Sequence, residues 1–240
     1  MKTIALIPAR LESERFPNKL IKKLYGVPII VRTYLAALDS KLFDQVYVVS
    51  GNDEIIDLIK SKDGLTFKSR KIHQSGTDRI AEAAKEIDHD IVVNLQGDEP
   101  FINIDAINNL ISSFEDNSVK MASLMTSFNS FDEINNPNNV KVTVDKNNNA
   151  IFFSRSPIPA GENKIKKFNR HIGVYAFRKK TLINFSSLNR SKNEISQNLE
   201  GNRAIDNLIP VKMIKIDFHG ISIDTEKDFI EAEKYLSKND

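Results

Sequence analysis

Short apolar runs alternate with amphipathic stretches along the first half of the chain. Continuous apolar runs predict buried strands, and apolar residues spaced three and four apart predict helices. This alternation is typical of a largely parallel sheet that is covered by helices on both faces. The predicted strands are 3–9, 45–50 and 90–96, and the predicted helices are 27–38, 52–62, 77–87 and 105–114.

The pattern changes after about residue 118, where four strand-like runs follow one another without a helix between them. Successive strands of this kind favour antiparallel or mixed pairing. Helices return at 181–188 and 195–208, strands follow at 211–217 and 221–224, and a last helix covers 226–236. The sequence therefore predicts one compact α/β domain over residues 1–240, with a β-rich subregion at 118–180 and a mobile charged loop at 161–169.

Composition narrows the class of protein. With 40% hydrophobic and 28% charged residues, a chain of 240 residues can bury a sizeable core and remain in solution. A formal net charge of +2 argues against a general affinity for nucleic acid or for an anionic membrane. The chain has no cysteine, which excludes disulfides and thiolate chemistry. It also lacks a signal-peptide pattern and an apolar stretch long enough to insert in a membrane, so a cytoplasmic location is predicted.

Three cations follow the first predicted strand within one short connection: Arg10, Arg15 and Lys19. Ligands of open parallel sheets bind at the carboxyl ends of the strands, where this connection begins. The segment has neither the Gly-x-Gly-x-x-Gly pattern nor the Gly-Lys-Ser/Thr of a P-loop. Guanidinium and ammonium groups could still neutralise a polyphosphate. A solvated turn with scattered cations is the alternative interpretation.

Two carboxylates occupy comparable positions at strand ends. Asp98 follows the strand at 90–96, and Asp224 ends the short strand at 221–224. Mg²⁺ prefers oxygen ligands and commonly takes one or two carboxylates together with phosphate oxygens. The pair could hold such a cation if the two strands are neighbours, whereas a turn residue or a helix cap is the alternative.

Further polar residues lie where predicted loops meet helices and strands. The segment 73–79 reads His-Gln-Ser-Gly-Thr-Asp-Arg, in which Ser75 and Thr77 can cap a helix whose free N–H groups could meet a base or a phosphate. Simple capping with an exposed Arg79 is the alternative. At later strand ends, Arg155 suits a substrate carboxylate, while His171, as a lone histidine, is more often structural.

Taken in order, these blocks resemble a known family. The segments IPARLESERFPNKL, HQSGTDR, NLQGDEPFI, NPNNVKVTVD, AIFFSRSPIP, RHIGVYAFR and SIDTEKDF are similar to successive motifs of the 3-deoxy-manno-octulosonate (Kdo) cytidylyltransferases, from about residue 3 to residue 236. The resemblance implies a Rossmann-like α/β/α nucleotidyltransferase fold with a mixed central sheet. It also implies a small β-rich region that helps to form a homodimer.

The resemblance further implies the reaction and its residues. CTP and Kdo would give CMP-Kdo and pyrophosphate with Mg²⁺, for lipopolysaccharide or capsule synthesis. Residues implied to grip the CTP phosphates are Arg10, Ser13, Arg15 and Lys19, and those near the nucleotide are Ser75, Thr77, Asp78 and Arg79. Residues implied to line the sugar-acid pocket are Gln96, Arg155, His171, Tyr175 and Glu200. The metal ligands would be Asp98 and Asp224, which with Arg10 and Lys19 form the implied catalytic set.

Several positions depart from the family pattern. Asn18 and Leu20 replace a common Gly and Pro on either side of Lys19, and Ser50-Gly51 replaces a Thr-Asp pair. The segment before the strand with His171 lacks the family's usual Arg-Asp pair. Residues 197–203 read Gln-Asn-Leu-Glu-Gly-Asn-Arg where relatives often have Glu-x-Leu-Glu-Gln-Leu-Arg.

These departures leave alternatives to Kdo open. An 8-amino Kdo analogue, another 2-keto sugar acid, or a nucleotide-binding paralogue without activity each fit the altered segment at 197–203. Sialate-type cytidylyltransferases and hexose-phosphate uridylyltransferases are rivals that the QGDEP and HQSGTDR blocks disfavour.

Overall fold

The computed structural model describes residues 1–13, 16–161, 164–217 and 223–237. Its contacts divide the chain into two compact units. The first unit comprises Met1–Ile107 and Gly220–Asp240, and the second comprises Asn108–His219. The single domain expected over 1–240 therefore stays a prediction, while the expected β-rich subregion at 118–180 lies inside the second unit.

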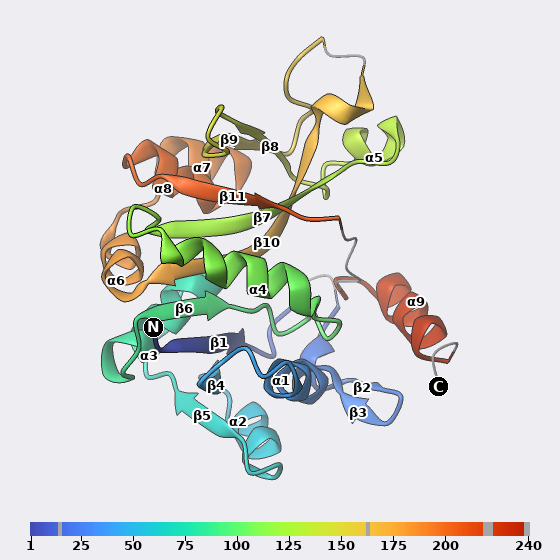
Figure 1. Cartoon of the computed structure of the whole chain (residues 1–240). Coiled ribbons are helices and arrows are strands. Elements are labelled where there is room, and N and C mark those ends of the chain that lie inside the picture. Colours follow the sequence, from blue (N-terminus) through green and yellow to red (C-terminus); the bar gives the residue numbers. More distant parts are fainter. Residues whose placement is uncertain (14–15, 162–163, 218–222, 238–240) are drawn as a thin grey trace. The chain divides into compact units, whose positions relative to one another are not determined.

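The first unit is built on a parallel sheet with the strand order β6-β1-β4-β5 (Figure 1). All seven residues of β1 are buried, as a central strand covered on both faces requires. The strands are β1 (Thr3–Ala9), β4 (Gln45–Ser50), β5 (Leu65–Lys68) and β6 (Ile91–Asn94). A two-stranded hairpin of β2 (Lys23–Leu24) and β3 (Val27–Pro28) lies apart from this sheet.

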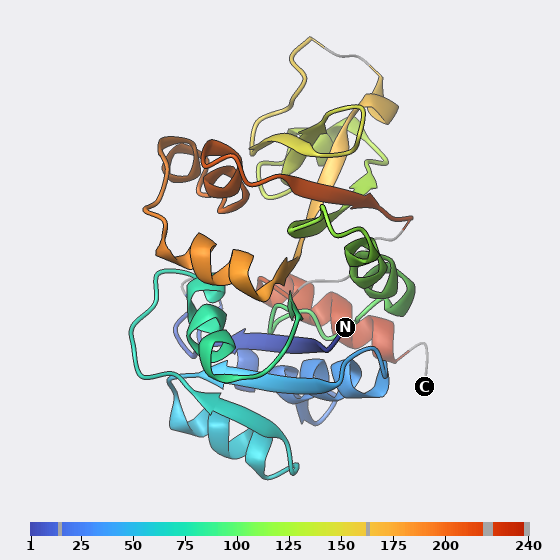
Figure 2. The ribbon, with the colours of Figure 1, turned by 60° about the vertical axis from the view of Figure 1, so that its left-hand side comes forward.

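Helices cover both faces of the parallel sheet (Figure 2). α1 and α2 contact each other on one face, and α3 packs against β1 from the other face. This arrangement follows from right-handed crossovers, because the chain first moves outward from β1 to β5 and then returns to β6. The helices of this unit are α1 (Ile29–Asp39), α2 (Asp53–Lys60), α3 (Gly76–Glu86) and α9 (Glu226–Leu236), and α4 (Ile104–Ser112) leads on into the second unit.

The second unit has mixed strand pairing. β7 lies between β11, with which it is parallel, and β10, with which it is antiparallel (Figure 1). β10 also pairs with β8, which forms an antiparallel hairpin with β9. The strands are β7 (Met121–Ser127), β8 (Lys141–Val144), β9 (Ala150–Ser154), β10 (Asn169–Arg178) and β11 (Val211–Lys215). The helices are α5 (Phe131–Asn135), α6 (Lys179–Ser187), α7 (Lys192–Gln197) and α8 (Gly201–Asp206).

Three expectations need correction. The helix predicted at 195–208 is two short helices, because Asn198 adopts a left-handed conformation (φ 52°) that ends α7. The segment 161–169, expected to be a loop throughout, contains a buried Phe168 and enters β10 at Asn169. Its residues 162–163 lie outside the described part of the chain, and its mobility stays a prediction. The strand predicted at 221–224 lies partly outside the described residues, and Ile223 and Asp224 belong to no strand.

No helix within the described ranges is both long and apolar enough to cross a membrane. This agrees with the short apolar runs of the sequence.

Close packing at Gly64 generates a prediction about stability. A Cβ atom there would lie 2.5 Å from Ile59 Cγ2 and 2.9 Å from both Ile59 O and Tyr34 Cε1. We expect Gly64→Ala to lower the free energy of unfolding by about 1–3 kcal/mol, because the site has no room for a methyl group. Gly51→Ala is the matched control, since its nearest contact would be at 3.8 Å. Urea unfolding of both variants measures the difference, and equal midpoints would contradict the prediction.

Candidate active site

The loop after β1 brings its cations back to the sheet edge. The backbone N–H of Asn18 donates to Leu11 O (3.3 Å), which closes the loop on itself. Asn18 adopts a left-handed conformation (φ 56°), which asparagine tolerates better than most residues other than glycine. Arg10 is exposed and Ser13 is partly buried in this loop, whereas Arg15 lies outside the described residues.

Lys19 stands at the centre of a charged cluster in the first unit. Its ammonium group contacts the carboxylate of Asp98, lies 3.1 Å from Asp224 Oδ1 and donates to Ile223 O at 3.2 Å. Asp98 follows β6, and Asp224 precedes α9. The backbone N–H of Ile223 donates to Asp98 O (3.0 Å), which joins the two segments directly. The structure thus brings together three of the four residues of the predicted catalytic set.

The electrostatics of this cluster are those of a partly desolvated ion group. Burial alone would lower the pKa of Lys19, but Asp98 and Asp224 outweigh it and raise that pKa. Glu99 has its pKa raised to about 8, by burial first and then by the charges of Asp98 and Asp224. Lys19 opposes this rise. Negative charge is therefore in excess at this point, and a further cation would relieve it.

The two carboxylates fit a hard divalent cation. Asp98 and Asp224 both contact Lys19 and so form a pair of carboxylates. Within the described residues, no cluster of three or more histidine, aspartate or glutamate side chains could hold a metal ion. A pair of carboxylates is a common protein contribution to Mg²⁺ binding when phosphate oxygens and water supply the other ligands. The residues Asp98 and Asp224 could therefore hold Mg²⁺ together with a nucleotide.

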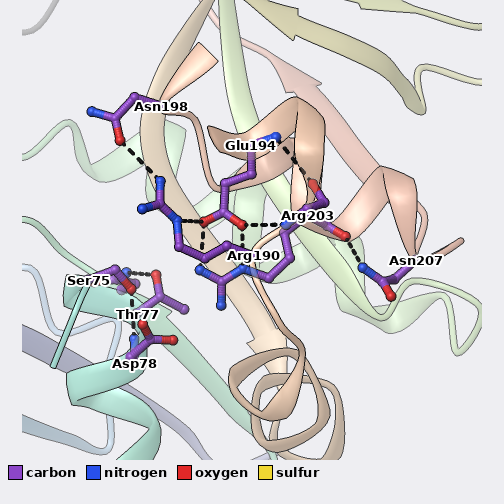
Figure 3. A network of polar contacts seen from close by, with 10 residues as sticks. Ser75, Thr77, Asp78, Arg190, Glu194, Asn198, Arg203 and Asn207 are labelled. Atoms are coloured by element: carbon purple, nitrogen blue, oxygen red, sulfur yellow. Dashed lines mark hydrogen bonds and ion pairs between the residues drawn. The ribbon is translucent and has the colours of Figure 1, made fainter. Parts of the chain in front are cut away.

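The start of α3 presents hydrogen-bonding groups within the same unit (Figure 3). Ser75 caps the helix, accepting from the N–H of Asp78 (3.1 Å), and Asn94 Nδ2 donates to Thr77 Oγ1 (3.0 Å). The capping predicted for Ser75 is confirmed. Gln96 belongs to this region too, since its Oε1 would lie 4.0 Å from a Cβ at Gly76.

Arg79 links α3 to the end of β1. Its Nη1 donates to Ala9 O at 2.6 Å, so the side chain is held beside the sheet edge and is not freely exposed. Burial lowers the pKa of Arg79, and so does the nearby charge of Arg10, while Glu12 and Glu82 raise it. Two of the predicted phosphate and nucleotide residues, Arg10 and Arg79, are thus close enough to repel each other.

In the second unit, His171 is held among aromatic rings. Its ring lies 4.8 Å from that of Phe153 and 5.3 Å from that of Tyr175, measured between ring centroids. Ser123 Oγ donates to Val174 O (2.8 Å), so its oxygen accepts from His171 Nε2 at 2.9 Å. This assigns the proton to Nε2 and leaves Nδ1 of the neutral ring as an acceptor.

Tyr175 is the second predicted sugar-pocket residue in this group. Burial raises its pKa well above the ordinary value, and the charges of Glu200 and Glu194 act in the same direction. The N–H of Gly201 hydrogen bonds to the tyrosine and opposes the rise. His171, Tyr175 and Glu200 therefore lie near one another, and the hydroxyl of Tyr175 remains protonated at neutral pH.

Arg155 is oriented by α7 and by a turn before β8. Its backbone N–H donates to Gln197 Oε1 (3.0 Å), its Nε to Gln197 O (2.9 Å), and its Nη1 to Pro137 O (3.1 Å). The guanidinium thus donates to backbone carbonyls, an arrangement that the sequence did not reveal. The structure places Arg155 in the same unit as His171 and Tyr175 and places Gln96 in the other unit.

The departures from the family pattern at 197–203 all contact β9 or Arg155. A Cβ at Gly201 would lie 2.6 Å from Phe153 Cε2 and 2.8 Å from the Tyr175 hydroxyl, so only glycine fits. The Asn202 side chain accepts from the N–H of Phe153 (3.0 Å) and donates to its carbonyl (2.9 Å). Together with Gln197, whose two oxygens accept from Arg155, these residues form one packed set.

A buried ion network joins α7 to α8 (Figure 3). The carboxylate of Glu194 contacts Arg203 Nη2 at 2.7 Å and Arg203 Nε at 2.8 Å, and Arg190 Nε lies 3.4 Å away. The Arg203 guanidinium also stacks over the ring of Phe185 (4.7 Å). A bidentate pair of this kind is well satisfied despite its burial.

The sequence did not single out Glu194, Arg203 or Lys141. Lys141 is fully buried, and its ammonium donates to Asn136 O (3.0 Å) and Arg155 O (2.7 Å). Burial lowers its pKa, followed by the charge of Arg155. The sequence alone gave no sign that this lysine is buried, because its partners are main-chain carbonyls of other segments.

A parallel sheet with cations and paired carboxylates at its strand ends is suited to an enzyme that binds a nucleotide together with a metal ion. Comparison with known proteins defines the group more closely. A family model described as "Cytidylyltransferase" matches residues 4–217. The chain belongs to this cytidylyltransferase family.

Two relatives align with nearly the whole chain. The 3-deoxy-manno-octulosonate cytidylyltransferase of Flavobacterium johnsoniae is 47% identical, and the alignment covers 98% of this chain and 99% of that protein. The corresponding protein of Christiangramia forsetii is 42% identical, with 98% and 97% covered. The resemblance deduced from the motifs and the expectation of a nucleotidyltransferase enzyme are confirmed.

Solved structures with a similar fold support the predicted architecture. A CMP:2-keto-3-deoxy-manno-octonic acid synthetase complexed with CTP has a TM-score of 0.94 at 31% identity, with 100% of both chains covered. A 4-diphosphocytidyl-2C-methyl-D-erythritol synthase from Anaerococcus prevotii has a TM-score of 0.67 at 17% identity, which shows a shared fold alone. The predicted α/β nucleotidyltransferase fold with a mixed sheet is confirmed.

The environment of His171 generates a prediction about pH. Burial lowers its pKa to about 3, whereas histidine in an unfolded chain titrates near pH 6.5. Between these values the unfolded chain binds a proton that the folded protein does not, so stability falls as the pH falls from about 6.5 towards 3. We expect His171→Asn to remove a slope of up to about 1.4 kcal/mol per pH unit from the free energy of unfolding.

Urea unfolding of the two proteins at a series of pH values from 7 to 4 measures this slope. Carboxylates titrate alike in the wild type and in His171→Asn, so the difference between the two slopes is the contribution of the histidine. Parallel curves over the whole range would contradict the assignment of a neutral, buried imidazole.

Proposed function

We propose that this protein is a cytidylyltransferase that joins CTP to 3-deoxy-manno-octulosonate and releases pyrophosphate. The observation that carries the proposal is the convergence of Lys19, Asp98 and Asp224 on one point at the sheet edge. Full-length similarity to proteins named for this activity, one of them solved with CTP, supports it. The product would be the CMP-activated sugar acid that lipopolysaccharide or capsule synthesis consumes.

The first unit receives CTP. Arg10 and Lys19 offer one guanidinium and one ammonium to the phosphates, and Arg79 adds a guanidinium that is already fixed to Ala9 O. The N-terminus of α3, with Ser75, Thr77 and Asp78, lies at the same edge, and such an end favours anionic or polar ligand groups. Arg15 and Ser13 belong to the same proposed set by motif.

Asp98 and Asp224 are the proposed ligands of Mg²⁺. When bound, the metal supplies positive charge that offsets the charge growing on the phosphate oxygens in the transition state. Lys19 contacts the same carboxylates, so its ammonium group lies beside the proposed metal site. When the carboxylates bind Mg²⁺, this ammonium group can bind a phosphate oxygen instead. Its raised pKa keeps it protonated for this role.

The second unit supplies the proposed residues for the sugar acid. Arg155 can attract its carboxylate, while His171, Tyr175 and Glu200 offer an acceptor nitrogen, a hydroxyl and a carboxylate to its hydroxyl groups. In the reaction, the anomeric hydroxyl oxygen bonds to the α-phosphorus of CTP, and the bond from that phosphorus to the pyrophosphate oxygen breaks. The hydroxyl proton passes to solvent as the new ester bond forms, and pyrophosphate carries away the electron pair of the broken bond.

A related sugar acid is the second candidate substrate. Gly201 packs against the hydroxyl of Tyr175, so the contacts around this tyrosine differ from those of relatives with glutamine there. An 8-amino Kdo analogue or another 2-keto sugar acid would meet this altered surface.

A homodimer and a cytoplasmic location, both implied by the sequence, remain predictions that light scattering and cell fractionation can test.

A substrate panel tests the function. Pyrophosphate release is measured with CTP or UTP, Mg²⁺, and each of Kdo, its 8-amino analogue and a sialate. We expect release with CTP and Kdo and little with UTP. Turnover of another sugar acid alone would replace Kdo as the substrate, and no turnover with any pair would refute the proposal.

Removing one carboxylate tests the metal role. We expect Asp98→Asn to lose at least about 100-fold in turnover at low Mg²⁺ and to regain part of it at high Mg²⁺, because the metal binds more weakly. Asp53→Asn is the control, since Asp53 forms an exposed ion pair with Lys68. Unfolding curves verify that both variants fold. Normal turnover of Asp98→Asn at low Mg²⁺ would remove the residue from the metal site.

A further inference from the structure

A second polar cluster of the first unit centres on Glu82 of α3. One carboxylate oxygen, Oε2, accepts from Ser69 Oγ (2.7 Å) and from His73 Nε2 (2.7 Å). The other, Oε1, accepts from the backbone N–H of Arg70 (3.1 Å). We call Ser69, the backbone of Arg70, His73 and Glu82 the Glu82 cluster. The cluster thus joins three positions of the loop before α3, namely Ser69, Arg70 and His73, to Glu82 of α3.

This cluster is not a nucleophile with its base. Ser69 has a single hydroxyl proton, and its shortest bond donates that proton to Glu82. His73 Nε2, which is 3.0 Å from Ser69 Oγ, is therefore a donor and cannot accept a proton from the serine. The geometry is that of a carboxylate held by three donors and not that of a hydrolase triad.

The Glu82 cluster holds a loop that has little other support. Residues 69–74 join the end of β5 to Ser75, the N-cap of α3. The N–H of Ser69 donates to Ser50 O (2.9 Å), which fixes the beginning of the loop. Beyond it, the side chain of Ile72 is fully exposed, so core packing does not determine the course of the chain there.

Burial gives these hydrogen bonds their strength. The side chains of His73 and Glu82 are only 10% and 14% exposed. Burial alone would raise the pKa of Glu82, but the bonds from Ser69, His73 and Arg70 lower it, so the carboxylate stays charged. A shielded charge that depends on three donors strongly favours the one loop conformation in which all three are in place.

The cluster is also coupled to the proposed phosphate site. Glu82 lies one helical turn after Arg79 and raises the pKa of Arg79, which opposes the effect of Arg10. The carboxylate therefore offsets part of the repulsion between two cations that the proposed function assigns to the nucleotide. One side chain acts on the loop before α3 and on a cation within α3.

We propose that His73 and Glu82 are positioning residues for CTP. Through the Glu82 cluster they set the course of residues 69–74, and thereby the placement of Ser75, Thr77 and Asp78 at the start of α3. The inference rests on the proposed function, since it assumes that this edge receives the nucleotide, but it adds two residues that contact neither phosphate nor sugar acid.

The test compares variants in this cluster with a matched control. His73→Phe removes the donor, His73→Gln keeps an N–H donor, and Glu82→Gln removes the charge. Glu86→Gln is the control on the same helix, because Glu86 pairs with Arg70 at 3.8 Å in an exposed position. Measurements are CTP affinity by calorimetry, KM for CTP and for Kdo, kcat, and the midpoint of thermal unfolding.

We expect His73→Phe and Glu82→Gln to weaken CTP binding and raise its KM about tenfold, as the loss of a charge-assisted hydrogen bond implies. KM for Kdo should change less than about twofold, which is within the spread of surface substitutions. His73→Gln should recover most of the CTP affinity, and Glu86→Gln should match the wild type.

Two outcomes overturn the positioning role. One is a lower unfolding midpoint with unchanged CTP affinity well below it, which would make the cluster purely structural. The other is an equal rise of both KM values. If His73→Phe does not fold, Ser69→Ala removes one donor and serves as the milder variant. A wild type that binds no CTP would instead refute the proposed function and the positioning role with it.

Discussion

Two carboxylates that share one ammonium form the constraint on which the rest of the site depends. Asp98 and Asp224 are far apart in the chain, yet Lys19 contacts both, and burial together with these two charges raises the pKa of the neighbouring Glu99. Such a group is stable only while each member is held in place, because a desolvated charge without its partner is costly. The hydrogen bond from Ile223 to Asp98 fixes the two carboxylates relative to each other.

Backbone conformation positions the other polar side chains of the two units. The left-handed Asn18 turns the chain so that Lys19 starts a short helical turn at the cluster, and the cap at Ser75 starts α3 where Arg79 can reach Ala9. The second unit uses other means. There a buried pair of Glu194 and Arg203 supports the short helices that present Glu200 and Gly201. In both units, the conformation of the main chain therefore determines where the polar side chains lie.

Local pattern predicted most of the fold but not the contacts of the site. The periodicity at 3–9, 27–38 and 45–50 predicted strand and helix correctly, because burial on a sheet leaves a strong local signal. It missed the break at Asn198, since a single left-handed residue leaves no periodic trace. The partners of Glu82 and Lys141 also escaped, because hydrogen bonds between distant segments depend on the tertiary fold.

The double hydrogen bond between Asn202 and Phe153 has a practical consequence for chimeric enzymes. Asparagine here satisfies both main-chain groups of a strand residue, as a neighbouring strand would do. A leucine introduced with a relative's segment would leave those groups bare, and a glutamine at 201 would displace the aromatic ring beneath it. Grafting that segment therefore requires exchanging β9 at the same time, because the two segments pack against each other as one unit.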